Sequence, residues 1–379
     1  MFRSLQKLNP DEAFDLVWIE TGFIGDVILA SAAMALSKRH FPRVRQFVVT
    51  TPLGAQVLDG CAYLDGVVVF DKRGQSSFAA FAAARRGLGK LRVACGGSFA
   101  RKVLTVVPHR SYRSALLSHY LGHDRIVYDE SPLSFGAVAK VSRVAVLHES
   151  ARVGLLLEPL GVSREAILTC RPELTHLAGR PNRDLLPVAP PGGWVAIAPG
   201  SVWGTKRWPR QGFARVAEWL LSQTECGVVL LGSAAEVEVC RSIEKILGSS
   251  EILNDLAKAK LLNLGGKTGI EDLKFVFPRM RALLSNDSSP VHFASAYGVP
   301  TVTIFGATVP GMGFGPLSAG SETIGVSLPC RPCSDHGPKT CPLGHFKCMK
   351  ELQPEQVIAA MERVLQASPT SSLPKRGEQ

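Results

Sequence analysis

The stretch that decides the fold is DLVWIETGFIGD, Asp15 to Asp26. Residues 15–20 form an apolar run that predicts a buried strand, and residues 21–25 (TGFIG) predict a turn. A helix is expected from Asp26 to about residue 39, because Pro42 then stops it. A strand, a glycine-containing turn and a helix in this order are typical of a Rossmann-like domain.

The same alternation continues along the chain and predicts an α/β protein with parallel sheets. In the first half we expect strands at 45–50, 66–70 and 102–107 and helices at 111–121 and 149–160. In the second half we expect strands at 194–198, 227–231, 282–285 and 301–305 and helices at 209–222, 234–247, 271–279 and 289–297. Ligands of such sheets bind beyond the carboxyl ends of the strands, so the loops there are the candidate sites.

The domain organisation follows from this repetition. Residues 169–193 are rich in proline and show little periodicity, which predicts a linker. We therefore expect two Rossmann-like domains, residues 1–185 and 186–365, that face each other across an active-site cleft. The polar residues 366–379 are predicted to be a disordered tail.

Length and composition agree with two globular domains. The chain has 379 residues, 46% of them hydrophobic, and a formal net charge of +11. No segment has the roughly 18–20 uncharged apolar residues that span a bilayer, and the N-terminus lacks the apolar core of a signal peptide, so we expect a cytoplasmic protein. Residues 72–152 hold 14 Lys and Arg against 4 Asp and Glu, which indicates an anionic partner or a solvated surface.

The first candidate site is the turn that ends in Gly25 and Asp26. Its glycines would let a ligand approach the backbone, and the following helix N-terminus would attract an anion. The turn does not match the GxGxxG dinucleotide fingerprint, which argues against a dehydrogenase. Asp26 is either a catalytic carboxylate or an ordinary acid of a first helical turn.

The second candidate site is APGSVWGTKRWP, residues 198–209, between a predicted strand and helix. A diphosphate would meet backbone N–H groups there, together with the hydroxyls of Ser201 and Thr205 and the ammonium of Lys206. The alternative is a polar surface loop. The spacing does not match a Walker A loop, so ATP hydrolysis is not indicated.

The third candidate site is SNDSSPVH, residues 285–292. Asp287 could bind a ribose or sugar hydroxyl, and Ser288 and Ser289 lie where a helix N-terminus could hold a phosphate, although either serine could simply cap that helix. His292 is a possible ligand-facing donor or a structural histidine. Glu236 is a possible ribose acceptor or a first-turn acid.

Cysteines form the fourth motif. Cys330, Cys333, Cys341 and Cys348 lie within 19 residues and could hold a structural zinc ion, whereas reduced thiols are the alternative in a cytosolic protein.

Taken together, the blocks TGFIGDVILASAA, APGSVWGTKRWP, LLGSAAE, LSNDSSPVHFASAYGVPTVTIFGAT and CRPC…CP…CM resemble glycosyltransferase family 9, the bacterial heptosyltransferases, and most nearly the heptosyltransferase II branch. The resemblance covers about residues 15–362. It implies the GT-B architecture and inverting transfer of L-glycero-D-manno-heptose from ADP-heptose to a hydroxyl of the lipopolysaccharide inner core, heptosyl-Kdo2-lipid A, with no cofactor required for catalysis. One position departs from the family's SNDSG, where Ser289 replaces the glycine.

The resemblance also implies roles for single residues. Asp26 matches the catalytic base, Lys206 the residue that holds the donor diphosphate, and Glu236 and Asp287 donor-binding acids. Arg110 and Arg113, in the basic segment, are candidates for the anionic acceptor, as is Gly25 beside the base. We expect peripheral contact with the cytoplasmic face of the inner membrane and no nucleic-acid partner, because no nucleic-acid module is present. The alternatives are a relative with another nucleotide sugar or glycan acceptor, and a non-catalytic sugar-nucleotide-binding scaffold.

Overall fold

The computed structural model describes residues 7–71, 77–96, 101–175 and 185–368. The chain divides into two compact units, Met1–Thr175 and His176–Gln379. Residues 176–184 of the predicted linker and 369–379 of the predicted tail lie outside the described residues. The last helix runs to Ala367, so the first two residues of the predicted tail are helical.

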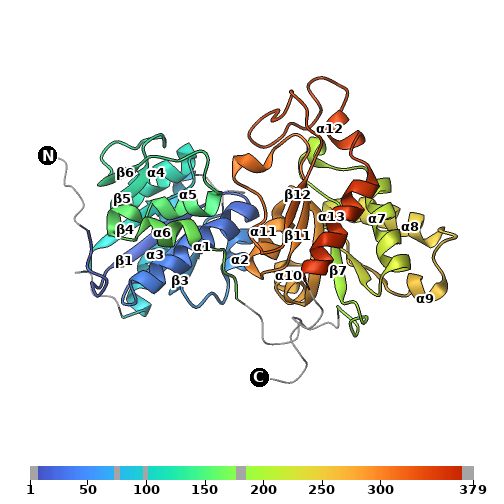
Figure 1. Ribbon diagram of the computed structural model, residues 1–379. Coiled ribbons are helices and arrows are strands. Elements are labelled where there is room, and N and C mark those ends of the chain that lie inside the picture. The colour runs from blue at the N-terminus through green and yellow to red at the C-terminus, as the bar shows by residue number, and fades with distance from the viewer. Residues whose placement is uncertain (1–6, 72–76, 97–100, 176–184, 369–379) are drawn as a thin grey trace. The chain divides into compact units, whose positions relative to one another are not determined.

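The first unit is a six-stranded parallel sheet in the order β3-β2-β1-β4-β5-β6 (Figure 1). Its strands are β1 (Asp15–Glu20), β2 (Arg45–Thr50), β3 (Gly66–Val69), β4 (Val103–Val107), β5 (Asp124–Tyr128) and β6 (Ala139–Val141). Its helices are α1 (Ile24–His40), α2 (Pro52–Leu58), α3 (Ser77–Ala94), α4 (Tyr112–Leu121), α5 (Glu149–Leu155) and α6 (Arg164–Thr169), with a 3₁₀ turn at Glu158–Leu160.

The second unit is also a six-stranded parallel sheet, in the order β12-β11-β10-β7-β8-β9. Its strands are β7 (Trp194–Ala198), β8 (Gly227–Leu230), β9 (Leu261–Asn263), β10 (Met280–Asn286), β11 (Thr301–Ile304) and β12 (Glu322–Ile324). Its helices are α7 (Arg210–Gln223), α8 (Val237–Gly248), α9 (Asp255–Lys258), α10 (Ile270–Val276), α11 (Ser289–Ala296), α12 (Lys347–Lys350) and α13 (Pro354–Ala367), and 3₁₀ turns lie at Gly204–Lys206, Ala234–Glu236, Phe277–Arg279 and Pro310–Met312.

Both sheets have the same doubly wound topology. In each of them the first and fourth strands are neighbours, β1 beside β4 and β7 beside β10, and the chain winds outward from this pair in both directions. The order of strands reverses at that pair, which makes the carboxyl ends of these strands the ligand-binding position of such a sheet. The observed sheets confirm the predicted α/β class with two parallel-sheet domains.

Burial on both faces explains why the central strands are apolar throughout. All six residues of β1 are buried. On one face of the first sheet, Val17 and Ile19 pack with Leu88 of α3 and Leu117 of α4. In the second unit, Val195 and Ile197 pack in one core with residues of α7, α8 and α13. These cores hold the strand ends, and thus the loops that follow them, in fixed positions.

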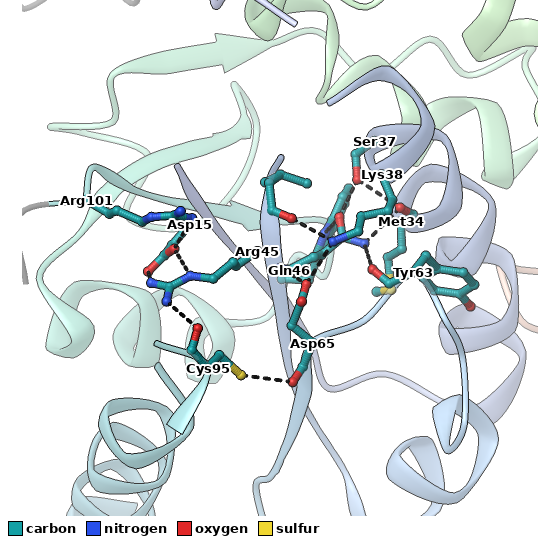
Figure 2. Close-up of polar contacts among 12 residues, drawn as sticks. Asp15, Met34, Ser37, Lys38, Arg45, Gln46, Tyr63, Asp65, Cys95 and Arg101 are labelled. Atoms are coloured by element: carbon teal, nitrogen blue, oxygen red, sulfur yellow. Dashed lines mark hydrogen bonds and ion pairs between the residues drawn. The ribbon is translucent and has the colours of Figure 1, made fainter. Parts of the chain in front are cut away.

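A buried ionic cluster fixes the opposite, amino-terminal edge of the first sheet (Figure 2). The carboxylate of Asp15 accepts two hydrogen bonds of 2.8 Å from the Arg45 guanidinium and one of 2.7 Å from Arg92. Arg101 lies 4.0 Å from the same carboxylate. The hydrogen bonds that Arg45 donates to Asp15 raise the pKa of Arg45. The cluster ties β1, β2 and α3 together and keeps this buried acid paired.

The structure also contains elements that the sequence pattern did not predict. These are α2, α3, β5, β6, α6, α9, β9, β12, α12 and α13. The edge strands β6, β9 and β12 have only three residues each, too few for a periodic pattern. Most predicted elements agree with the observed ones within two residues, while the predicted helix 149–160 ends as a helix at Leu155 and continues as a 3₁₀ turn.

A pH dependence of stability follows from His123, at the start of β5. The pKa of His123 is lowered from its ordinary 6.5 to about 4. The main cause is burial, and the positive charges of Arg92 and Arg85 add to it. The unfolded chain therefore binds the proton more readily than the folded protein, so the free energy of unfolding should fall as the pH decreases from about 6.5 to about 4. In urea unfolding across this range, the free energy of unfolding should depend less on pH for His123→Gln than for the wild type. An equal dependence on pH in the two proteins would contradict the lowered pKa of His123.

Candidate active site

In the first unit, Asp26 lies in the first turn of α1, at the carboxyl end of β1. Its Oδ2 accepts a hydrogen bond of 3.0 Å from the backbone N–H of Phe23, and the side chain is half-buried. This is the contact that a first-turn helix acid makes. The same carboxylate stands at the switch point of the sheet, where a ligand would bind, so the position fits both readings of Asp26.

A second carboxylate, Glu20, borders the same turn. Glu20 is the last residue of β1, only 2% exposed, and its Oε1 accepts a hydrogen bond of 2.8 Å from the N–H of Gly22. A Cβ atom at position 22 would lie 2.7 Å from Asp26 Oδ2 and 2.8 Å from Glu20 Oε1. Glycine is therefore needed where two carboxylates flank the backbone. The sequence analysis did not predict Glu20 as a site residue. An acidic residue at the end of a buried strand could have indicated this role.

Polar side chains from the loops that follow β1 and β4 and from α4 complete this edge. The Thr21 and Ser114 hydroxyl oxygens lie 2.9 Å apart, and Nδ1 of His109 lies 3.1 Å from Ser114 Oγ. His109 was not predicted either. Arg110 forms an ion pair of 2.6 Å with Glu130 at the surface, and Arg113 is exposed on the first turn of α4.

The second unit brings together three of its side chains at the carboxyl ends of β7, β10 and β11. Lys206 Nζ donates a hydrogen bond of 2.6 Å to Asp287 Oδ2, and the Thr308 hydroxyl donates another of 2.6 Å to the same oxygen. All three are largely buried. The structure thus joins two predicted site residues from loops 81 positions apart and adds Thr308, the last residue of the block LSNDSSPVHFASAYGVPTVTIFGAT, to which no role was assigned. A buried ammonium at this switch point is suited to an anionic ligand.

The loop that carries Lys206 is fixed by Asn286. The Asn286 amide donates to the carbonyl of Pro199 over 2.8 Å and accepts from the N–H of Trp208 over 3.1 Å. Ser201 and Thr205 are buried in this loop. The Ser201 hydroxyl accepts from the N–H of Trp203, and the Thr205 hydroxyl donates to the Pro338 carbonyl, so both hydroxyls also hold the loop in shape.

Glu236 approaches the same loop from the end of β8. Its Oε2 accepts hydrogen bonds of 2.8 Å from both the N–H and the hydroxyl of Ser233, which is the first-turn role that the sequence left open. A Cβ atom at Gly200 would lie 2.0 Å from Glu236 Oε1. The glycine therefore lets this carboxylate lie directly against the loop of Lys206.

The remaining predicted donor residues belong to the start of α11. Ser288 is its N-cap in extended conformation, with its hydroxyl 3.3 Å from the Asn286 carbonyl oxygen, and Ser289 is its first residue. The backbone at Ser289 is not left-handed, so this position does not require the family's glycine. His292 belongs to α11, and its side chain is buried, with 6% exposed.

The cysteine-containing segment packs against the Lys206 loop. Arg331 donates to the carbonyls of Phe305 and Thr308 over 2.8 Å, and a Cβ atom at Gly337 would lie 3.1 Å from the Thr205 hydroxyl. Among the described residues, no three His, Cys, Asp or Glu side chains are grouped so that they could hold a metal ion. The four predicted ligands are free thiols in the structure, and the zinc site stays a prediction. Backbone N–H groups, that of Phe346 foremost, lower the pKa of Cys341.

Comparison with known sequences places the second unit in a family. Residues 178–345 match the sequence profile of glycosyltransferase family 9 (heptosyltransferase). Lipooligosaccharide heptosyltransferase 2 of Campylobacter jejuni subsp. jejuni serotype O:2 is 35% identical over 175 residues, which are 46% of this chain and 51% of that protein. The chain spans about half the length of the curated relatives that it matches. The resemblance to the family is confirmed.

Comparison with solved structures extends the likeness of fold to nearly the whole chain. The structure of Escherichia coli ADP-heptose lps heptosyltransferase II has a TM-score of 0.72 at 19% identity and covers 93% of this chain and 99% of its own. The E. coli heptosyltransferase WaaC with ADP has a TM-score of 0.67 at 17% identity, with 93% and 100% covered. No helix within the described residues is both long and apolar enough to cross a membrane.

Proposed function

From the glycosyltransferase family 9 domain that residues 178–345 form, we propose that the protein is a heptosyltransferase of lipopolysaccharide core synthesis. The donor is ADP-L-glycero-D-manno-heptose, and the acceptor is a hydroxyl of the inner core, heptosyl-Kdo2-lipid A. The observation that carries the proposal is the buried Lys206–Asp287–Thr308 cluster at the switch point of the matched unit. The choice of donor is supported by the heptosyltransferase names of the relatives and by the WaaC structure, which was solved with ADP.

The proposed reaction is a single displacement with inversion. The acceptor oxygen forms a bond to C1 of the heptose while the bond from C1 to the diphosphate oxygen breaks, and ADP leaves with the electron pair. Asp26 accepts the proton of the attacking hydroxyl. Lys206 stabilises the negative charge that develops on the departing diphosphate. In this proposal no metal ion is required, and undiminished transfer in the presence of EDTA is the expected result.

The donor contacts are assigned by position. Asp287 and Glu236 accept from hydroxyls of the nucleotide sugar, and backbone N–H groups of the Ser201–Thr205 loop and of the α11 N-terminus at Ser288 and Ser289 meet the phosphates. When the diphosphate arrives, the Lys206 ammonium exchanges part of its contact with Asp287 for a contact with phosphate oxygen. His292 is proposed to shape the pocket wall from inside α11.

The acceptor contacts are assigned to the first unit. Arg113, on the first turn of α4, is proposed to bind phosphate or Kdo carboxylate groups, with Arg110 able to join it by leaving its surface pair with Glu130. Gly25 keeps the backbone beside Asp26 open to the acceptor. An acceptor of this kind is anchored in lipid, so we place the protein at the cytoplasmic face of the inner membrane.

The decisive experiment measures release of ADP from ADP-heptose with and without heptosyl-Kdo2-lipid A. We expect release that depends on the acceptor, together with a gain of one heptose in the mass of the product. ADP binding without release would point to another sugar or acceptor, and no ADP binding at all would contradict the proposal. Zinc content, measured in the same preparation, tests the predicted cysteine site.

A further inference from the structure

The outward side of α4 is unusually apolar for a helix at the surface. Helical spacing places Tyr112, Leu116 and Tyr120 on one side, while Leu117 and Leu121 point into the core. Tyr112 is 72% exposed and Leu116 is 48% exposed. Single exposed apolar side chains need no explanation, but neighbouring ones indicate an interaction surface.

Neighbouring elements extend this surface on both sides. Phe78 of α3, 70% exposed, meets the Tyr120 ring edge-on with the ring centres 5.9 Å apart. Phe135, 64% exposed, lies with its ring centre 5.2 Å from that of His119. We name the side chains Phe78, Tyr112, Leu116, Tyr120 and Phe135 the aromatic face. Ring contacts with Tyr120 and His119 join Phe78 and Phe135 to the outward side of α4.

The backbone under Phe135 is held rigidly. The Arg125 guanidinium donates to the carbonyls of Leu133 and Phe135 over 3.0 Å and 2.6 Å, and it is itself buried at the start of β5. His119 Nε2 lies 3.1 Å from the Leu133 carbonyl oxygen. The buried Arg125 thus fixes the backbone that holds Phe135 exposed to solvent. A rigid, exposed apolar side chain is suited to a preformed contact surface, because little conformational freedom is lost on binding.

Exposed cations lie on both helices of the aromatic face, Arg85 and Arg86 on α3 and Arg113 on α4. From Lys72 to His123 the sequence contains ten Lys and Arg and no Asp or Glu. Arg85 lies 5.7 Å from the centre of the Tyr120 ring, so a cation sits within the aromatic face itself. The acids that flank this stretch in the sequence are Asp71 and Asp124, and Glu130, further along the chain, is paired with Arg110. Aromatic side chains among cations match the headgroup region of an anionic bilayer.

Helix α4 carries the aromatic face on its outward side and contacts the candidate acceptor site through its inward side. Ser114, in the first turns of α4, lies 2.9 Å from Thr21 of the Asp26 turn, and Phe23 in that turn is 68% exposed. A protein seated on a bilayer through α3 and α4 would therefore hold Asp26 near the lipid surface. We infer that the aromatic face docks on an anionic lipid bilayer. This deepens the proposed function, although its binding test is independent of the reaction.

The test is sedimentation of the full chain with vesicles of phosphatidylcholine alone or with phosphatidylglycerol added. We expect binding only to the anionic vesicles, weakened by salt. Phe135→Ser and Arg85→Glu should each lower the vesicle affinity roughly tenfold. The first removes an apolar contact with the bilayer, and the second replaces an attractive charge with a repulsive one. Leu256→Ser and Arg241→Glu are matched controls from exposed positions of the second unit, 80% and 67% exposed, and should bind as the wild type does.

The possible outcomes are distinct. Equal binding to neutral vesicles, absence of binding by the wild type, or wild-type affinity in both Phe135→Ser and Arg85→Glu would overturn the inference. Self-association that Phe135→Ser abolishes, without vesicle binding, would show that a second copy covers the aromatic face and would overturn it too. Vesicle binding that depends on these residues, in a protein that releases no ADP with any acceptor, would leave the docking surface intact and defeat the proposed reaction instead.

Discussion

Asp26→Asn is expected to slow heptose transfer by about 10²–10⁴-fold while ADP binds with unchanged affinity. The amide oxygen of asparagine can still accept the hydrogen bond from the N–H of Phe23, so the turn at the start of α1 should keep its shape. What the substitution removes is a carboxylate that can take a proton from the acceptor. The measurement is the rate of acceptor-dependent ADP release, with ADP affinity followed by calorimetry.

This substitution also separates the two readings of Asp26. If the residue is only a first-turn helix acid, turnover should stay at the wild-type level and stability should fall by about 0.5–1 kcal/mol. Glu165→Gln is the matched control, because Glu165 is an exposed acid in the first turn of α6. Wild-type turnover in Asp26→Asn would therefore remove the base from the mechanism without questioning the fold.

Lys206→Ala is expected to lower kcat by about 10²–10³-fold. The ammonium is the charge proposed to stabilise the departing diphosphate, and its loss should affect kcat more than the KM of the acceptor. The substitution also leaves the buried Asp287 carboxylate with Thr308 as a partner but without a cation, so thermal unfolding must be followed beside the kinetics. A midpoint measured with saturating ADP would show whether the donor site still forms.

Lys245→Ala provides the comparison for this variant. Lys245 is an exposed lysine in the last turn of α8, in the same unit, and its removal should change neither kcat nor the unfolding midpoint. A folded Lys206→Ala protein with a kcat within a factor of about two of the wild type would place the stabilising charge elsewhere in the loop.

The sequence predicted the central strands well because they are buried on both faces. The observed bounds of β1, β2 and β7 are the same as the predicted ones. The alternation of strands and helices also placed the candidate loops correctly at the ends of β1, β7 and β10, since a parallel sheet collects all its carboxyl ends at one edge. The helix α3 was not predicted, because alanine, glycine and arginine give it only a weak amphipathic pattern.

The parts of the site that the sequence could not predict depend on contacts between distant segments. Thr308 shares an oxygen of Asp287 with Lys206, and Arg331 holds the carbonyl of Thr308, but the sequence blocks that contain Thr308 and Arg331 assign neither residue a role. His109 reaches the Asp26 turn only because β4 pairs with β1. The spacing of residues along one segment carries no signal for such contacts, which arise from strand order.

Two complete sheets in one chain allow each unit to change separately. The family profile matches within the second unit alone, whereas the likeness of fold to solved heptosyltransferases spans both units. Because each sheet has its own core, substitutions that remodel one unit need not disturb the packing of the other. Under the proposed function, selection for a new acceptor can thus act on the first unit while the second unit keeps its binding of the nucleotide sugar. Grafting a foreign first unit onto this second unit is, by the same logic, the natural way to redirect the sugar to another glycan.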